Sequence, residues 1–151
     1  SAWIDSISNE EQTITLYYPY KYKARFDVTE SLEYSIHFRL AEQYLIRSEA
    51  RTRIGNLIGA SEDLNMIRNR AGLANTTANS ESELLEAILA ERRVELFTEQ
   101  GHRWFDLRRT GRATAVLGMF KPDWEDTDVL FPIPEIELEA NPNLLPQNQG
   151  Y

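Results

Sequence analysis

The fold is decided by residues 81–110, "ESELLEAILAERRVELFTEQGHRWFDLRRT". Ser80 directly precedes this stretch and Glu83 follows three residues later, which is the spacing of a capping box and predicts a helix start after the serine. Apolar residues then recur at helical spacing up to the first of two glycines. We therefore predict helices at 81–100 and 102–110, each ended by a glycine.

A similar pattern lies upstream. Helical periodicity predicts a helix at 36–54 and a shorter one at 61–71, where Ser61 is in the position of an N-cap. Two consecutive helix-turn-helix pairs are typical of tetratricopeptide-like packing, although the first helices start further apart than that repeat's usual period. We predict a mainly α fold, with tetratricopeptide-like helix pairs over residues 35–112.

The two ends of the chain do not continue this pattern. Residues 1–34 are predicted to be an irregular or extended lead-in segment, because threonine, isoleucine and tyrosine favour strands and a proline interrupts them. Residues 113–151 are predicted to be an acidic loop and an extended, proline-rich tail that packs on the helices, since closely spaced prolines prevent a long helix. Together the segments would form a single domain.

Composition excludes several classes of function. A net charge of −8 argues against a general nucleic-acid binder, which needs a basic surface. The chain has no cysteine, so it has neither disulfides nor thiol chemistry. It contains no apolar run long enough for a transmembrane helix, and residues 1–10 lack the features of a signal peptide.

Charged residues are concentrated in the helices. Glu91, Glu95 and Glu99 recur every four residues, so they form a like-charged ridge that needs cationic partners where it borders the core. We interpret these side chains as a structural ion network between helices rather than as a ligand site. Its predicted members are Arg68, Arg70, Glu91, Arg92, Glu95, Glu99, Arg103 and Asp106.

Catalytic and metal motifs are absent from the sequence. The two histidines occur without a zinc-binding spacing, and there is neither a nucleophile elbow nor a glycine-rich phosphate loop. Residues 123–128, "DWEDTD", resemble a calcium loop but lack its glycine and its closing glutamate. We expect no metal, no cofactor and no enzymatic activity, with a hydrolase as a distant alternative.

Aromatic residues outside the predicted helices are the better candidates for a ligand site. Flat rings on loops can stack against the C–H faces of sugar rings. We select Trp124 first, because four acidic residues surround it, and then Tyr18 and Trp3. The alternative is that these rings cover the core beneath the loops.

Four segments, in order, resemble the C-terminal portion of the SusD/RagB family. They are "FRLAEQYLIRSEA" (38–50), "LNMIRNRAGL" (64–73), "AERRVELFTEQGHRWFDLRRTGRA" (90–113) and "LFPIPEIELEANPNLLPQNQGY" (130–151). Each segment alone is weakly specific, whereas the ordered set is highly specific. The resemblance covers roughly residues 20–151.

The resemblance implies a non-catalytic lipoprotein on the surface of the bacterial outer membrane. Members of this family capture oligosaccharides or other nutrients and deliver them to a TonB-dependent transporter of the SusC type. Their helix pairs serve as a scaffold, and loops supply most ligand contacts. The alternative is a helical-repeat adaptor that binds protein only, through the faces of helices 36–54 and 81–100.

The chain departs from this family in length and in lacking a lipid-accepting cysteine. We therefore expect it to be a C-terminal piece of a longer protein. Any membrane association would come only through a lipid anchor that this chain does not contain.

Overall fold

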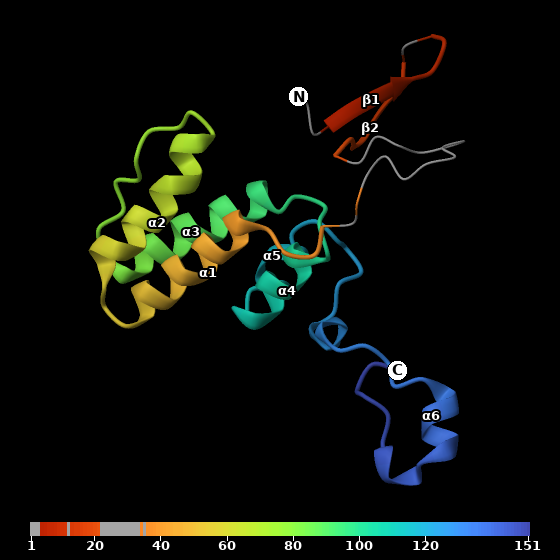
Figure 1. Ribbon diagram of the computed structural model, residues 1–151. Helices are drawn as coiled ribbons and strands as arrows, with labels where there is room; N and C mark the ends of the chain where they lie inside the picture. The colour runs from red at the N-terminus through yellow and green to blue at the C-terminus, as the bar shows by residue number, and fades with distance from the viewer. Residues whose placement is uncertain (1–3, 12, 22–33, 35) are drawn as a thin grey trace. The chain divides into compact units, whose positions relative to one another are not determined.

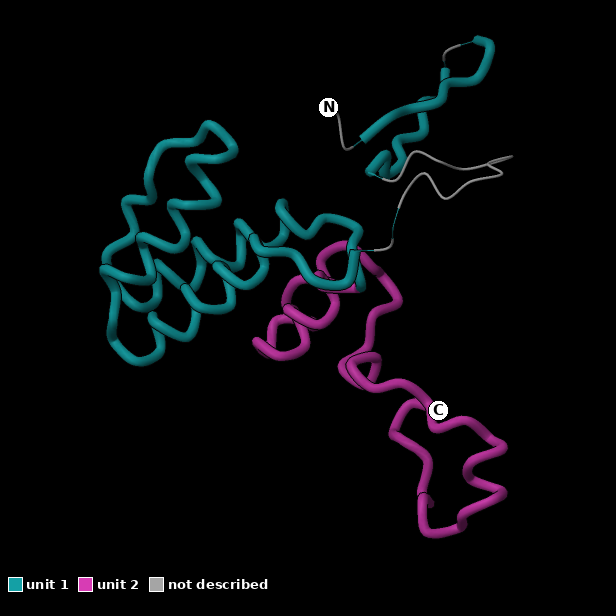
Figure 2. The backbone as a smooth tube through the Cα atoms, in the orientation of Figure 1, with its two compact units in different colours: residues 1–100 teal, residues 101–151 magenta. Residues whose placement is uncertain are grey.

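The computed structural model describes residues 4–11, 13–21, 34 and 36–151. The chain forms two compact units, residues 1–100 and residues 101–151, which are coloured separately in Figure 2. The boundary between the units lies next to Gly101. The sequence predicted a single domain in which the helix pairs give way to a loop and tail near residue 113.

Three helices form the helical part of the first unit: α1 (Leu40–Arg53), α2 (Leu57–Arg70) and α3 (Glu81–Glu95). All three pack against one another (Figure 1). Their contact buries a compact apolar core, which consists of Ala41, Leu45, Ala60, Leu64, Ile67, Leu84 and Ile88. The mainly α, helix-pair fold predicted from the sequence is confirmed.

Small residues bring α1 and α2 close together. The buried Ser48 hydroxyl on α1 donates to the backbone oxygen of Ala60 on α2, at 2.7 Å. A larger side chain at either position would hold the two helices further apart. This hydrogen bond joins two helices that are adjacent in sequence, as expected for a helix-turn-helix pair.

The starts of α1 and α2 differ from the predicted ones. The predicted helix at 36–54 begins only at Leu40, because Arg39 has an extended backbone, with φ −116° and ψ 136°. The predicted helix at 61–71 begins earlier, at Leu57, because the Asn56 side chain accepts from the backbone nitrogen of Gly59 and caps the helix there. Ser61 lies inside this helix rather than at its start.

Helix α3 begins where predicted and ends early. The Ser80 and Glu83 capping box is present, but the helix ends at Glu95 rather than at residue 100. Thr98 and Gln100 have positive φ angles, of 58° and 43°, which do not belong to a right-handed helix.

The lead-in segment contains a β-hairpin. Strands β1 (Ile4–Ser8) and β2 (Thr15–Pro19) pair antiparallel, with Asp5 opposite Tyr18. The sequence indicated extended structure here, and the pairing register shows which residues face each other.

The second unit contains α4 (His102–Arg109), α5 (Ala113–Leu117) and α6 (Glu135–Ala140), and two 3-10 turns, η1 (Asp126–Val129) and η2 (Pro142–Leu144). Gly111 ends the turn after α4 with φ +67°, and α4 ends one residue before the predicted 102–110 boundary. The prediction of an extended tail at 113–151 is therefore wrong in part. Short helices fit between the prolines, and α6 begins directly after Pro134 with two glutamates in its first turn, where carboxylates are favourable.

Within the described part of the chain, no helix combines the length and apolar character needed to cross a lipid bilayer.

Candidate functional site

The carboxylates on α3 have cationic partners on α2. Arg68 donates to Glu91 at 3.2 Å, and Arg70 pairs with Glu95. Both glutamates are buried, with exposed fractions of 8% and 4%. Because an unpaired buried carboxylate is costly, these pairs hold α2 and α3 in register.

Two further cationic side chains, both distant in sequence, pair with the ridge of glutamates at 91, 95 and 99. Arg39 pairs with both Glu95 and Glu99, and Lys21 pairs with Glu99. Lys21 also donates to the backbone oxygen of Glu95, at 3.0 Å. Sequence spacing predicts neither cation, since 74 residues separate Lys21 from Glu95 and no local pattern relates them.

The remaining members of the predicted network divide between the two units. Arg92 on α3 lies 3.9 Å from Glu42 on α1. In the second unit Asp106 accepts from Arg109 on the same helix, at 2.8 Å. Arg103 is exposed on α4 of that unit.

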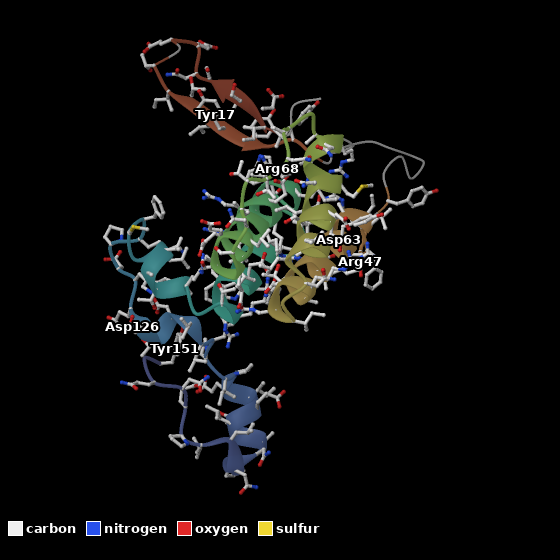
Figure 3. All side chains as sticks on the ribbon, turned by 90° about the vertical axis from the view of Figure 1, so that its left-hand side faces the viewer. Tyr17, Arg47, Asp63, Arg68, Asp126 and Tyr151 are labelled. Atoms are coloured by element: carbon white, nitrogen blue, oxygen red, sulfur yellow. The ribbon has the colours of Figure 1, made fainter. Side chains whose placement is uncertain are left out.

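A third carboxylate, which the sequence analysis did not single out, joins α1 to α2. Asp63 on α2 is buried and accepts from Arg47 and Arg51 on α1 (Figure 3). These charged groups lie at helix contacts and are occupied by each other, so they stabilise the scaffold and offer little free hydrogen-bonding capacity to a ligand.

A groove in the second unit surrounds Trp124 instead. Its volume is about 620 Å³, within the range of ligand pockets. It is lined by residues of α4, α5, η1 and the segments that connect them: Trp104, Leu117, Phe120, Lys121, Pro122, Asp123, Trp124, Asp128 and Phe131. Trp124, the first ligand candidate selected from the sequence, lies in this groove.

The turn after α5 positions Trp124. Its indole nitrogen donates to the hydroxyl of Thr114 on α5, at 3.4 Å, and its backbone nitrogen donates to the oxygen of Lys121. A β-carbon at Gly118 would lie 2.9 Å from the Thr114 carbonyl oxygen, which is too close without a backbone shift, and 3.7 Å from the Trp124 ring, which is an ordinary contact.

Two more rings, those of Trp104 and Phe131, also line the groove. Trp104 on α4 makes edge-to-face contacts with Trp124 and Phe131, with ring centroids 6.2 and 6.0 Å apart. Phe131 remains 66% exposed and Phe120 75% exposed, so packing leaves much of their surface free. The buried indole nitrogen of Trp104 has no hydrogen-bond partner among the described residues.

The end of the chain fixes the segment that carries Phe131. The Gln147 amide exchanges two hydrogen bonds with the backbone of Ile133, both at 2.8 Å. Asn148 donates to the backbone oxygen of Phe131, and Tyr151 donates to that of Leu130. Terminal residues of the last segment that resembles the SusD/RagB family therefore hold the chain that carries Phe131.

Charged groups also line the groove. The Lys121 ammonium lies 5.9 Å from the centre of the Trp124 ring, in a cation–π position. Asp123 and Asp128 also line the groove, and Asp128 accepts from the backbone nitrogen of Glu125 at 2.9 Å. Aromatic faces beside an ammonium and carboxylates can stack on a sugar ring and hydrogen-bond to its hydroxyls.

The other two ligand candidates lie elsewhere in the chain. Tyr18 is in β2 of the first unit, where its hydroxyl donates to Asp5 at 3.1 Å and its ring contacts Tyr20 edge-to-face. Trp3 lies outside the described residues. Tyr18 and Trp124 thus belong to different units of the chain. In the ranges that the structure describes, no three metal-binding side chains gather.

Comparison with known proteins decides the family. The SusD family model matches residues 3–151, nearly the whole chain. The chain belongs to the SusD family. SusD-like protein P2 of Formosa agariphila is 34% identical over 154 residues, covering 91% of this chain and 30% of the relative. The starch-binding protein SusD of Bacteroides thetaiotaomicron is 35% identical over 124 residues, covering 76% of this chain and 21% of that protein.

The chain also resembles solved structures of SusD-like proteins. A crystal structure of a SusD-like protein from Bacteroides fragilis superposes with a TM-score of 0.65 and 32% identity, over 78% of this chain and 26% of that one. The chain thus spans between a fifth and a third of the length of these SusD relatives.

Proposed function

We propose that this chain is part of a nutrient-binding protein of the outer-membrane surface, which captures an oligosaccharide without cleaving it. The bound sugar then passes to a TonB-dependent transporter of the SusC type. The observation that carries the proposal is the aromatic groove around Trp124 in a member of the SusD family.

The groove suits a carbohydrate better than a purely apolar ligand. Ring faces of Trp124 and Phe131 can contact sugar C–H groups, while Lys121 and Asp123 reach hydroxyl groups at the edges. One relative is named a starch-binding protein, which supports a glycan as ligand. Trp124 is the proposed principal contact, and Tyr18 and Trp3 are proposed as secondary contacts.

Calorimetric titration with a panel of oligosaccharides that includes maltoheptaose tests this proposal. At least one oligosaccharide should bind to the intact chain. Trp124→Ala should weaken the affinity for that oligosaccharide about tenfold, because ring stacking is lost. Phe105→Ala is the matched control, because Phe105 is a 57% exposed ring on α4 that does not line the groove. Equal affinity for the wild type and Trp124→Ala would exclude the groove as the ligand site.

A protein-only adaptor is the second candidate, and exposed apolar side chains on the helices favour it. Leu40 and Ile46 on α1 and Val94 on α3 are 73%, 47% and 60% exposed. An adaptor would bind the transporter and none of the oligosaccharides, and Leu40→Ser with Ile46→Ser would weaken that binding. Turnover of any oligosaccharide would contradict both candidates.

A further inference from the structure

Charge around the Trp124 groove indicates which class of glycan it accepts. The turn and 3-10 segment at residues 119–128 carry four carboxylates and one ammonium group: Asp123, Glu125, Asp126, Asp128 and Lys121. Glu125 and Asp126 are exposed beside the groove-lining Asp123 and Asp128. With four carboxylates and one ammonium group, this segment carries a net charge of −3.

We infer that the groove selects neutral oligosaccharides and rejects sulfated or uronic-acid glycans; this inference rests on the proposed function. When a sulfated or uronic-acid sugar ring stacks on Trp124, its sulfate or carboxylate comes close to several carboxylates of the chain and to a single ammonium group. Like charges at such distances repel, and the repulsion is weakened by salt but not removed at moderate ionic strength.

The position of Lys121 keeps a cationic group of a ligand from stacking on the Trp124 ring. Its ammonium already occupies the cation–π position at the Trp124 ring, 5.9 Å from the ring centre. A ligand ammonium on the same ring would meet this charge, so the ring gains no new favourable cation contact. A neutral sugar uses the ring face and can accept a hydrogen bond from Lys121 without changing the charge of the site.

Matched pairs of glycans test this inference on the intact chain. The probes are maltoheptaose, cellohexaose and xylohexaose, each compared with its sulfated derivative and measured by calorimetry at low salt. A neutral probe that binds should bind at least about tenfold more tightly than its sulfated form, and the gap should shrink at about 1 M salt, where charges are screened.

A charge variant separates this inference from a steric effect of the sulfate groups. Glu125→Gln with Asp126→Asn removes two exposed carboxylates outside the groove lining. The affinity for the neutral probe should stay unchanged, while the affinity for the sulfated probe should rise by about tenfold because the repulsion weakens. No change for the sulfated probe would overturn the inference.

The outcomes distinguish the two proposals. If a sulfated probe binds at least as tightly as its neutral form and Trp124→Ala weakens that binding, the charge selectivity is wrong and the glycan-binding function stands. If no probe of either charge binds, both are wrong.

Discussion

Arg47 on α1 donates from Nε and Nη2 to the two carboxylate oxygens of Asp63 on α2, at 2.8 and 2.6 Å. The two residues lie next to each other in Figure 3. The Asp63 carboxylate raises the pKa of the Arg47 guanidinium above its ordinary value, first through the hydrogen bond and then through its charge. This two-point pair joins the helices of the first helix pair.

Asp63→Asn should lower the free energy of unfolding by about 2–4 kcal/mol, because it leaves Arg51 half-buried without a countercharge. Arg47→Met should cost less, since the Arg47 side chain is 55% exposed and Arg51 continues to pair with Asp63. Urea unfolding of both variants measures the difference. Equal losses would contradict a central role for the buried carboxylate.

Glu95→Gln should lower the free energy of unfolding by about 3 kcal/mol, because Arg39 and Arg70 both pair with this buried carboxylate. The matched control is Glu81→Gln, which breaks the exposed pair with Arg53 and should change stability by less than about 1 kcal/mol. Thermal unfolding checks both variants. Loss of oligosaccharide affinity in Glu95→Gln at unchanged stability would reverse this interpretation and make Glu95 a ligand residue.

Glu83 should make stability depend on pH. Hydrogen bonds from the backbone nitrogens of Asn79 and Ser80, and from the Ser80 hydroxyl, lower the pKa of Glu83 in the folded chain. Its contribution is therefore complete above the pKa of an unfolded glutamate and is lost as the pH falls through the lowered folded value.

Unfolding measured from neutral to acidic pH checks this dependence. Glu83→Gln keeps an acceptor in the capping box but cannot titrate, so its stability difference from the wild type should shrink toward low pH. A difference that stays constant with pH would show that the Glu83 charge contributes nothing.

Local sequence spacing predicted the parts of the fold that local interactions determine. The Ser80 and Glu83 capping box is formed within four residues, and it places the start of α3 correctly. The start of α2 was wrong because Asn56 and Ser61 are both good N-caps, and only the path of the preceding turn selects Asn56.

Contacts between distant segments could not be predicted in this way. Lys21 and Arg39 reach Glu99 across 78 and 60 residues, and no sequence spacing encodes that approach. The groove shows the same limit. Trp124 stood out by its acidic neighbours, whereas Trp104 and Phe131 looked like ordinary scaffold and tail residues until packing brought them to it.

Trp104→Phe should preserve stability better than its loss of size suggests. The buried indole nitrogen of Trp104 has no partner among the described residues, so phenylalanine removes a donor whose burial is costly. Trp104→Ala should instead lose roughly 2–3 kcal/mol, because the contacts with Trp124 and Phe131 disappear. If Trp104→Phe is as unstable as Trp104→Ala in thermal unfolding, the indole nitrogen has a partner in solution.

The indole N–H resonances of the three tryptophans test whether the oligosaccharide binds at Trp124, because each reports on one position in a ¹⁵N-labelled chain. The Trp124→Phe variant assigns the Trp124 resonance. When a neutral oligosaccharide that binds is titrated into the chain, this resonance should shift until the site is saturated. The Trp104 resonance should shift less. A saturating shift at Trp3, or at backbone amides of α1 and α3, with the Trp124 resonance unmoved would contradict the account.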